Sequence, residues 1–228
     1  MGCSAGPSVA SAPVLYLDAG NSKSYPATGT TWTDLSGNGN HGTLVNGPTY
    51  DAGYGGSLVF DGVNDYADCG NSTIINFGVS QSFTVAYWVY STAMAGYEAH
   101  VAKSSGNGWI PNLLWAGATP QLRWWLSSNV PVTYNSLKPY LNAWRYVAMS
   151  IDRSINTAHI FEDGVLVASA SISSSLDVAS NANLWIGNDV YGSAASAKIS
   201  AVQIYNRQLT TAAEVRQNFN AMRGRYGL

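Results

Sequence analysis

Short apolar runs separated by turn residues make up most of the chain. Ser82–Tyr90 reads SFTVAYWVY, which is apolar at both alternating sets of positions, and this predicts a central strand covered on two sides. In Tyr146–Asp152, Val147, Met149 and Ile151 share one face, the pattern of a strand with a buried side. Further strands are predicted at Val14–Asp18, Ser57–Phe60, Asp65–Asp68, His159–Phe161, Val165–Val167, Leu184–Ile186 and Ile199–Tyr205. The pattern predicts an all-β fold.

Two local signals add detail near the C-terminus. Asp163-Gly164 lies between two predicted strands and favours a tight primed turn, so this segment is predicted to be a β-hairpin. Thr211 and Glu214 have the spacing of a helix capping box. The apolar stripe of the helix that follows consists of Val215, Phe219 and Met222. We expect this short helix to pack its stripe onto the rim of the β-structure.

The composition indicates a single folded domain. Of the 228 residues, 46% are hydrophobic and 11% charged, with 8 Trp and 14 Tyr, whereas disordered chains are rich in charge and poor in aromatic rings. No linker or repeat follows residue 13. Residues 14–228 are therefore predicted to form one domain behind a flexible N-terminal arm, residues 1–13. The net charge is −2 and the Lys and Arg residues are scattered, which argues against nucleic-acid binding.

The leader and the cysteines indicate where the chain is made. MGCSAGPSVASAP lacks the basic and apolar regions of a secretory signal, and no apolar run is long enough to cross a membrane. We therefore expect a chain made in the cytoplasm, without a membrane partner. Cys3 and Cys69 are too few for a disulfide framework and are expected to stay reduced.

Several sequence blocks occur in an order typical of one family. The blocks are SLVFDGVNDY (Ser57–Tyr66), SFTVAYWVY, Trp144–Ser169, LWIGND (Leu184–Asp189) and IYNRQLTTAAEV (Ile204–Val215). In these blocks the chain resembles laminin-G-like, concanavalin A-like jelly-roll domains. The opening Leu15–Tyr50 and the closing Phe219–Gly227 are similar to the subgroup found in structural proteins of tailed bacteriophages.

The resemblance implies a jelly-roll sandwich of two antiparallel sheets with one short C-terminal helix. Phe60, Val85, Trp88 and Ile151 would then fill the space between the sheets. Because this fold carries lectins, hydrolases and virion proteins alike, it does not by itself specify a function.

Catalytic chemistry finds little support in the sequence. Glycoside hydrolysis needs two carboxylates facing one groove, and the glucanases of this fold carry acids at alternate positions of a strand. Glu98, Glu162 and Glu214 are the only glutamates, and none has an acid two residues away on a strand. Glu162 is expected at a hairpin tip. The three histidines lie in separate segments, and we assign no catalytic residues.

Calcium is the one metal that the sequence raises. Many laminin-G-like domains bind Ca²⁺ near the rim, and the FDGVND loop offers oxygen ligands from Asp61, Asn64 and Asp65. However, the acidic pair that the family often shows before its last strand is replaced here by Ser200-Ala201. The alternative is that these Asp and Asn side chains shape the turn by bonding their own backbone. No other cofactor is predicted.

Sugar binding would need exposed rings beside polar groups, because rings stack on the apolar face of a sugar. The candidates are Trp109, Trp115 and Trp125, near Asn112 and Arg123, and a second group formed by Asn188, Asp189 and Tyr191. Adjacent Trp124 and Trp125 must point to opposite faces of a strand, so one of them is expected to leave the core. The alternative is that the Trp residues fill the core or a subunit interface.

Taken together, the sequence predicts a non-enzymatic structural protein of a phage virion. It would be a capsid decoration, head-fibre or tail-associated component that contacts other virion proteins or copies of itself, with adhesion to host-surface glycans as a further role. The alternative is a free carbohydrate-binding module or lectin, and a glycoside hydrolase is the least favoured interpretation.

Overall fold

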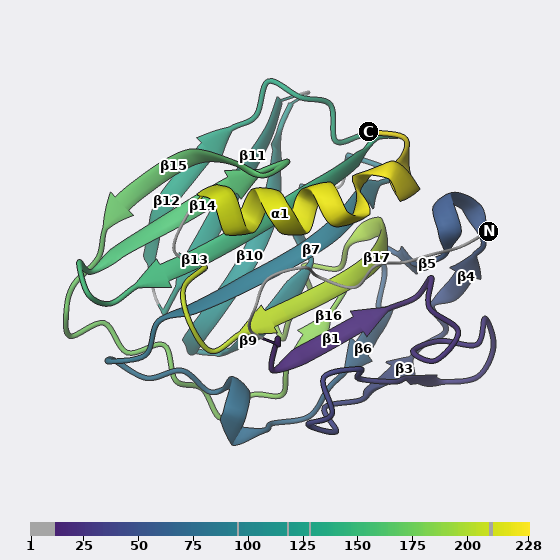
Figure 1. The fold of residues 1–228 in the computed structure, drawn as a ribbon, viewed down its shortest axis with the longest axis horizontal. Helices are drawn as coiled ribbons and strands as arrows, with labels where there is room; N and C mark the ends of the chain where they lie inside the picture. Colours follow the sequence, from purple (N-terminus) through teal and green to yellow (C-terminus); the bar gives the residue numbers. More distant parts are fainter. Residues whose placement is uncertain (1–11, 95, 118, 128, 210–211) are drawn as a thin grey trace.

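Two antiparallel sheets pack face to face, as the sequence predicts (Figure 1). The computed structural model describes residues 12–228 except 95, 118, 128, 210 and 211. The predicted arm therefore lies outside the described residues up to residue 11, and so do Cys3 and the capping residue Thr211. Among the described residues, no helix has the length and apolar character needed to cross a bilayer.

The first sheet has eight strands in the described part of the chain. Its order is β15 (Val165–Ser171), β14 (Thr157–Glu162), β13 (Trp144–Asp152), β7 (Phe83–Ser91), β17 (Ser196–Tyr205), β5 (Ser57–Asp61) and β4 (Thr49–Asp51), with β1 (Leu15–Asp18) also paired to β17.

The second sheet has nine strands over the same described ranges. Its order is β12 (Asn129–Asn135), β11 (Thr119–Leu126), β10 (Asn107–Ala116), β9 (Val101–Ser105), β16 (Trp185–Ile186), β6 (Tyr66–Asp68), β3 (Gly42–Val45) and β2 (Thr31–Trp32), with β8 (Tyr97–Ala99) also paired to β10.

Apolar side chains from both sheets fill the space between them. Phe60, Val85 and Ile151 are buried there, as predicted. Phe83 stacks on Phe77 with ring centroids 4.3 Å apart and contacts aromatic rings of the opposite sheet. Burying each of these large side chains stabilises the fold by roughly 1.5–3 kcal/mol. This interior holds the two layers together.

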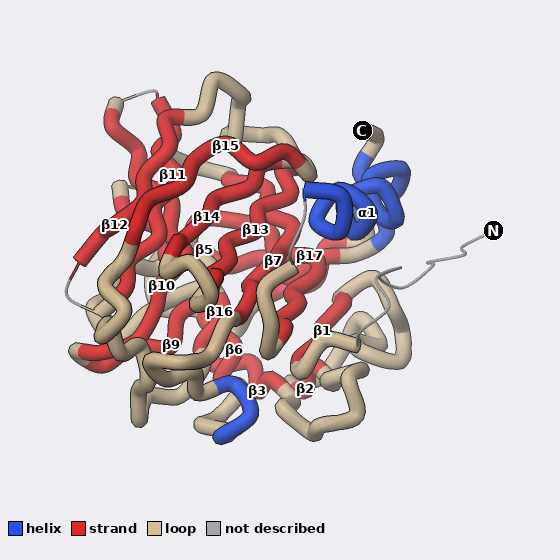
Figure 2. Tube along the Cα trace, turned by 60° about the vertical axis from the view of Figure 1, so that its left-hand side comes forward, coloured by secondary structure: helices blue, strands red, loops and turns tan. Residues whose placement is uncertain are grey.

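The helix α1 (Ala212–Met222) covers the outer face of the eight-stranded sheet. Its buried Val215 and Met222 and the half-buried Phe219 contact that face, so the predicted apolar stripe is confirmed. Figure 1 shows α1 lying in front of β13 and β7, and Figure 2 shows it outside the strands, next to β17. The prediction that the helix packs on the rim is wrong. Without α1, the apolar side chains on this face of the sheet would be exposed to solvent, and the helix buries them.

Trp88 lies under this helix and not between the sheets, which corrects a second prediction. It stacks on Tyr226 at 4.0 Å and on Phe219 at 5.6 Å between ring centroids. Val85 and Trp88 are three residues apart on β7, so they must face opposite sides of the sheet. The prediction that SFTVAYWVY is covered on both sides is confirmed, because the interior covers one side and α1 the other.

The hairpin between β14 and β15 is also confirmed. Asp163 and Gly164 both have positive φ, 50° and 78°, as a type I′ turn requires. Gly62, in the turn after β5, has φ of 79°, and a Cβ there would lie 1.9 Å from the hydroxyl of Ser196. Glycine is therefore required at this turn for both conformation and space.

A C-terminal turn, η3 (Arg223–Tyr226), joins the two ends of the domain. The guanidinium of Arg225 donates to the fully buried carboxylate of Asp18 at 2.7 Å and to the hydroxyl of Ser200 at 2.9 Å. It also donates to the carbonyl of Gly56 at 3.0 Å. Because a buried carboxylate needs a partner, this contact fixes η3 against β1 and β17. Two further turns are η1 (Gly53–Gly55) and η2 (Thr73–Ile75).

Replacing Trp88 with Ala tests the role of the helix cover. We expect Trp88→Ala to lower the free energy of unfolding by about 3–5 kcal/mol, because the substitution would leave a cavity between the sheet and the covering segments α1 and η3. Val63→Ala, at a position 73% exposed, is the control and should change stability by less than about 0.5 kcal/mol. Urea denaturation followed by tryptophan fluorescence measures both. A Trp88 variant as stable as wild type would contradict the packing described.

Candidate functional site

β10 and β11 turn a set of aromatic and polar side chains to the outer face of the nine-stranded sheet. Side chains alternate along each strand, and Trp109 and Trp124 are fully buried on the inner face. Ile110 is paired with Trp125, and Asn112 with Arg123, so these four residues occupy the outer face. Because one set of alternating side chains on each strand is buried in the interior, the other set must face outward.

These outward side chains line an open hollow of about 390 Å³. The loop after β16, residues 188–193, forms one wall, and β8 contributes a tyrosine. The lining residues are Tyr97, Ile110, Asn112, Arg123, Trp125, Asp189, Tyr191 and Ser193. Three aromatic rings and four polar side chains thus surround one space.

The aromatic rings of the hollow are partly exposed to solvent and pack against neighbouring side chains. Tyr97 is 53% exposed and Tyr191 is 59% exposed. Trp125 meets Tyr191 edge to face, with centroids 6.3 Å apart, and packs against the small apolar cluster that includes Ile110. The rings therefore present apolar surface to solvent while their positions are set by the strands beneath.

The wall formed by residues 188–193 is shaped by Asp189. One carboxylate oxygen of Asp189 accepts from the N–H groups of Tyr191 at 2.9 Å and Ser193 at 3.0 Å. The hydroxyl of Tyr191 accepts from the N–H of Gly106 at 2.8 Å, in the turn between β9 and β10. The backbone N–H and the side-chain hydroxyl of Tyr191 are therefore both hydrogen-bonded, and these bonds orient the ring before any ligand binds.

Two polar groups of the hollow lack partners within the described part of the chain. They are the side-chain oxygen of Asn112 and Nε of Arg123, both buried. The guanidinium carbon of Arg123 lies 5.2 Å from the ring centroid of Tyr97, a cation–π distance. Buried polar atoms without partners are costly, so a ligand that reaches them gains affinity.

The structure brings together three of the residues predicted for sugar binding. Trp125, Asp189 and Tyr191 all line the hollow. Asn188 does not line it, because its buried side chain accepts from the N–H of Asp189 at 2.8 Å and supports the loop from behind. The expectation for Trp125 from its neighbour is confirmed: Trp124 is in the core and Trp125 faces outward.

Trp109 and Trp115 are corrections to the same prediction. Trp109 is fully buried, with its ring 5.7 Å from that of Phe83, and the indole N–H of Trp115 donates to buried Glu98 at 3.2 Å. Both residues have the inward phase of β10, so neither ring can stack on a sugar. Tyr97 and Ser193 also line the hollow, although the sequence does not predict either as a site residue. Tyr97 lies on β8, a strand of three residues that is too short to show alternation.

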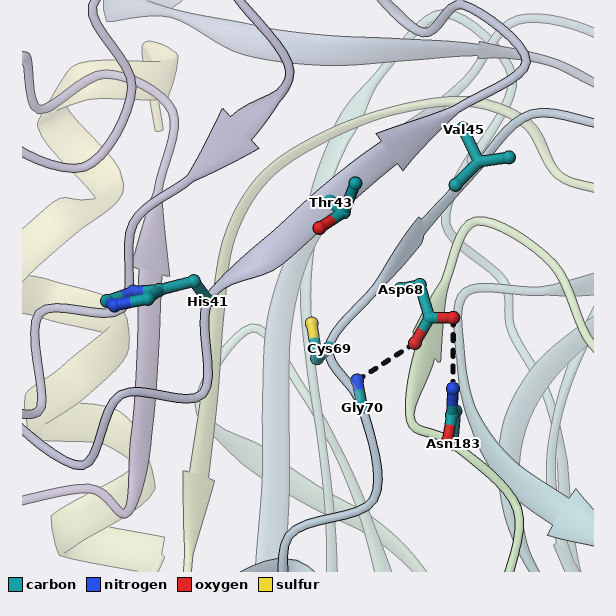
Figure 3. Close-up of a pocket in the computed structure, with 7 residues that line it drawn as sticks. All are labelled: His41, Thr43, Val45, Asp68, Cys69, Gly70 and Asn183. Carbon is teal, nitrogen blue, oxygen red and sulfur yellow. Dashed lines mark hydrogen bonds between the residues drawn. The ribbon is translucent and has the colours of Figure 1, made fainter.

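A second hollow lies over β3 and β6 of the same sheet (Figure 3). It measures about 470 Å³ and is lined by His41, Thr43, Val45, Asp68, Cys69, Gly70 and Asn183. Its carboxylate is already occupied, because Asp68 accepts from the N–H of Gly70 at 2.8 Å and from the amide of Asn183 at 3.0 Å.

The chemistry of the second hollow suits a sugar less well. Its lining contains no Trp, Tyr or Phe ring that could stack on one. Cys69 is a free, buried thiol whose pKa is raised by burial, so it is a poor nucleophile. The hollow beside Trp125 is therefore the better candidate site.

Comparison with known proteins assigns the fold to a family. The Laminin G 3 family model, described as the concanavalin A-like lectin/glucanases superfamily, matches residues 61–216. The chain belongs to this superfamily. No curated protein matches the sequence.

Solved structures similar to this superfamily member include two toxin binding domains. The binding domain of Paraclostridial Mosquitocidal Protein 1 has a TM-score of 0.71 at 18% identity, over 92% of this chain and 52% of that one. The binding domain of botulinum neurotoxin serotype G has a TM-score of 0.68 at 18% identity, over 91% and 50%. The chain thus spans about half the length of these toxin domains.

A third similar structure is a whole domain of comparable size. It is domain 4 of AbnA, a GH43 extracellular arabinanase from Geobacillus stearothermophilus, in complex with arabinotriose. The TM-score is 0.69 at 18% identity, over 90% of this chain and 97% of that one. At such identities the likeness shows a shared concanavalin A-like fold.

The superfamily includes glucanases, so the positions of the carboxylates matter. Glu98 is fully buried, and one of its oxygens lies 3.4 Å from Nε2 of His100. Glu162 is also fully buried and accepts from the hydroxyls of Ser136 at 2.5 Å and Tyr140 at 2.9 Å. Glu162 is the last residue of β14, beside the Asp163-Gly164 turn as predicted, but its side chain is buried. Neither carboxylate can reach a polysaccharide on the surface of this domain.

The FDGVND loop has the hydrogen bonds of a turn. A carboxylate oxygen of Asp61 accepts from the N–H groups of Val63 at 2.8 Å and Asn64 at 3.4 Å. Asp65 accepts from the N–H of Asp61 at 3.2 Å, and burial raises the pKa of Asp65. Within the described ranges, no three Asp, Glu, His or Cys side chains form a group that could hold a metal ion. The bonds favour the turn interpretation over a Ca²⁺ site.

Substitution of Asp61 separates the two interpretations. We expect Asp61→Ala to lower the free energy of unfolding by about 1 kcal/mol, because two backbone N–H groups lose their acceptor, whereas Asp61→Asn keeps the acceptor and most of the stability. Thermal unfolding with and without added CaCl₂ measures this. A Ca²⁺-dependent rise in the wild-type midpoint that is absent in Asp61→Asn would show a metal site instead.

Proposed function

We propose that this domain binds carbohydrate without transforming it, in the hollow beside Trp125. The observation that carries the proposal is the combination, on one sheet face, of three supported aromatic rings with polar groups that lack partners. Sugars offer the complementary surface, since their C–H faces stack on rings and their hydroxyls bond to amides and carboxylates.

The arrangement of the hollow fits a ligand held by its edges and one face. Trp125 and Tyr191 meet at an interplanar angle of 64°, so they form a corner rather than a flat platform. A sugar ring in this corner would stack on one ring and touch the edge of the other. The second carboxylate oxygen of Asp189 then supplies an acceptor for its hydroxyls, and the amide of Asn112 lies in the lining beside it.

The acids support binding over hydrolysis. The lining of the hollow includes one carboxylate, Asp189, and hydrolysis requires two that flank the scissile bond. The oxygen of Asp189 that bonds to two backbone N–H groups has a structural role in the loop. The similarity to domain 4 of the arabinanase, solved with arabinotriose, and to two binding domains of toxins is consistent with a binding role.

The same proposal extends to the setting of the domain. We propose that it is carried on a phage particle, as a decoration, fibre or tail-associated protein that contacts other virion proteins and adheres to host-surface glycans. Support comes from the resemblance of Leu15–Tyr50 and Phe219–Gly227 to phage structural proteins. These two segments meet in the fold, because Arg225 bonds to Asp18. A free lectin would use the same hollow in solution.

Binding to a glycan array tests the function. We expect the wild-type domain to bind a subset of glycans, and Trp125→Ala and Tyr191→Ala each to weaken that binding about tenfold or more, because each removes a ring of the corner. Tyr54→Asn is the matched control. Tyr54 is a 54% exposed ring away from the hollow, and its φ of 53° suits Asn. Glycan binding that survives both hollow variants would place the site elsewhere and contradict the proposal.

The virion setting has its own test. If the chain is a structural protein, purified particles of the phage that encodes it should contain its peptides by mass spectrometry, and an antibody against the domain should slow adsorption to host cells. The Trp125→Ala domain, used as a competitor, should protect cells less well than the wild-type domain. Particles without the chain would overturn the virion assignment and leave the glycan proposal standing.

A further inference from the structure

Arg123 is a cation without a counter-charge. In the described part of the chain, no carboxylate lies within 4.0 Å of its guanidinium, whereas Arg145, Arg207 and Arg225 each pair with an acid. Its contact is the ring of Tyr97, and its Nε is buried without a partner. A guanidinium has four further N–H donors besides Nε, and because Arg123 lines the hollow, the part of this group that faces the hollow can bind a ligand.

The surroundings of Arg123 favour an anion. Its cross-strand neighbours are Asn112 on β10 and Thr133 on β12, which are both uncharged. Tyr97 and Trp125 line the hollow together with Arg123, and a charge pair formed beside these apolar rings is screened less than one in bulk solvent. A planar guanidinium presents two parallel N–H groups, which match the two oxygens of a carboxylate.

The spacing on β11 links this anion site to the aromatic corner. Arg123 and Trp125 are two residues apart on the same face of one strand, so their Cα atoms are about 6.8 Å apart. This is close to the length of one sugar ring. A sugar that stacks on Trp125 can therefore direct a ring substituent to Arg123 without leaving the corner.

Asp189 sets the orientation. Its carboxylate lies in the lining on the loop side, beside Tyr191, and it would repel a second anion placed there. Hydroxyl groups of a sugar suit that end, since they can donate to Asp189. A ligand with a carboxylate at one end and hydroxyls at the other matches the hollow in one orientation only.

We propose that the glycan bound in this hollow is acidic, and that Arg123 binds its sugar carboxylate while Trp125 and Tyr191 hold the ring. This inference rests on the proposed function and narrows its ligand to carboxylated sugars. The shared chemistry is a carboxylate on a ring carbon, which both uronic and sialic acids carry.

Paired acidic and neutral probes test the inference. Trigalacturonic acid is compared with its methyl ester, and 3′-sialyllactose with lactose, by calorimetry at low and high salt. We expect at least one acid to bind about 10- to 100-fold more tightly than its neutral partner, with the preference reduced by salt. The probe that shows the preference identifies uronic or sialic acid as the source.

Variants of Arg123 assign the effect. Arg123→Gln should abolish the preference for the acid while binding of the neutral partner persists, and Arg123→Lys should retain only part of it, because Lys keeps the charge and loses the fork. Arg216→Gln removes the same charge from the exposed face of α1 and should leave the preference unchanged. Unfolding midpoints within a degree or two of wild type confirm that the variants are folded.

The outcomes distinguish the two proposals. Equal binding of acidic and neutral probes, lost in Trp125→Ala, would overturn the acidic-glycan inference and support the proposed function. A preference for acids that survives Arg123→Gln would also overturn the inference. Failure of every acidic and neutral glycan to bind would overturn the proposed function, and the inference with it.

Discussion

Successive side chains of a strand face opposite sides of its sheet, and this alternation connects the core of the domain to its surface. On β10 and β11 the interior takes Trp109 and Trp124, so the residues between them must face outward. Trp125 and Arg123 are therefore held by strands that cannot shift by one residue, since such a shift would expose the aromatic core. The rigidity of the candidate site is a consequence of how the sandwich packs.

The two sheets differ in what covers their outer faces. The eight-stranded sheet is covered by α1 and η3, whose side chains enclose Trp88, Trp144 and Tyr146. The nine-stranded sheet has no helix on its outer face among the described residues, and both hollows lie there. One sheet is thus buried on two sides, and the outer face of the other is left free to contact a ligand.

Much of this architecture could be predicted, because it depends on local pattern. The apolar alternation of β7 and β13, the Asp163-Gly164 turn and the helix stripe are visible in short windows of sequence. Because β7 is apolar on both faces, its sequence does not show which face meets the opposite sheet and which meets α1, and the position of Trp88 cannot be predicted from it. Trp109 and Trp115 share one phase of β10, and the local sequence does not show whether that phase faces the interior or the solvent, because the pattern allows rings on either side. Tyr97 joins the site through tertiary pairing of a three-residue strand, which no local pattern reveals.

The contact between Asp18 and Arg225 joins residues 207 positions apart. β1 is translated well before its partner strand β17 and before the guanidinium that neutralises its carboxylate. The eight-stranded sheet consequently cannot close until β17 and Arg225 have been synthesised. Such long-range closure is slow and leaves partly folded chains prone to association, so the domain depends on the segment around Arg225 to end that exposure.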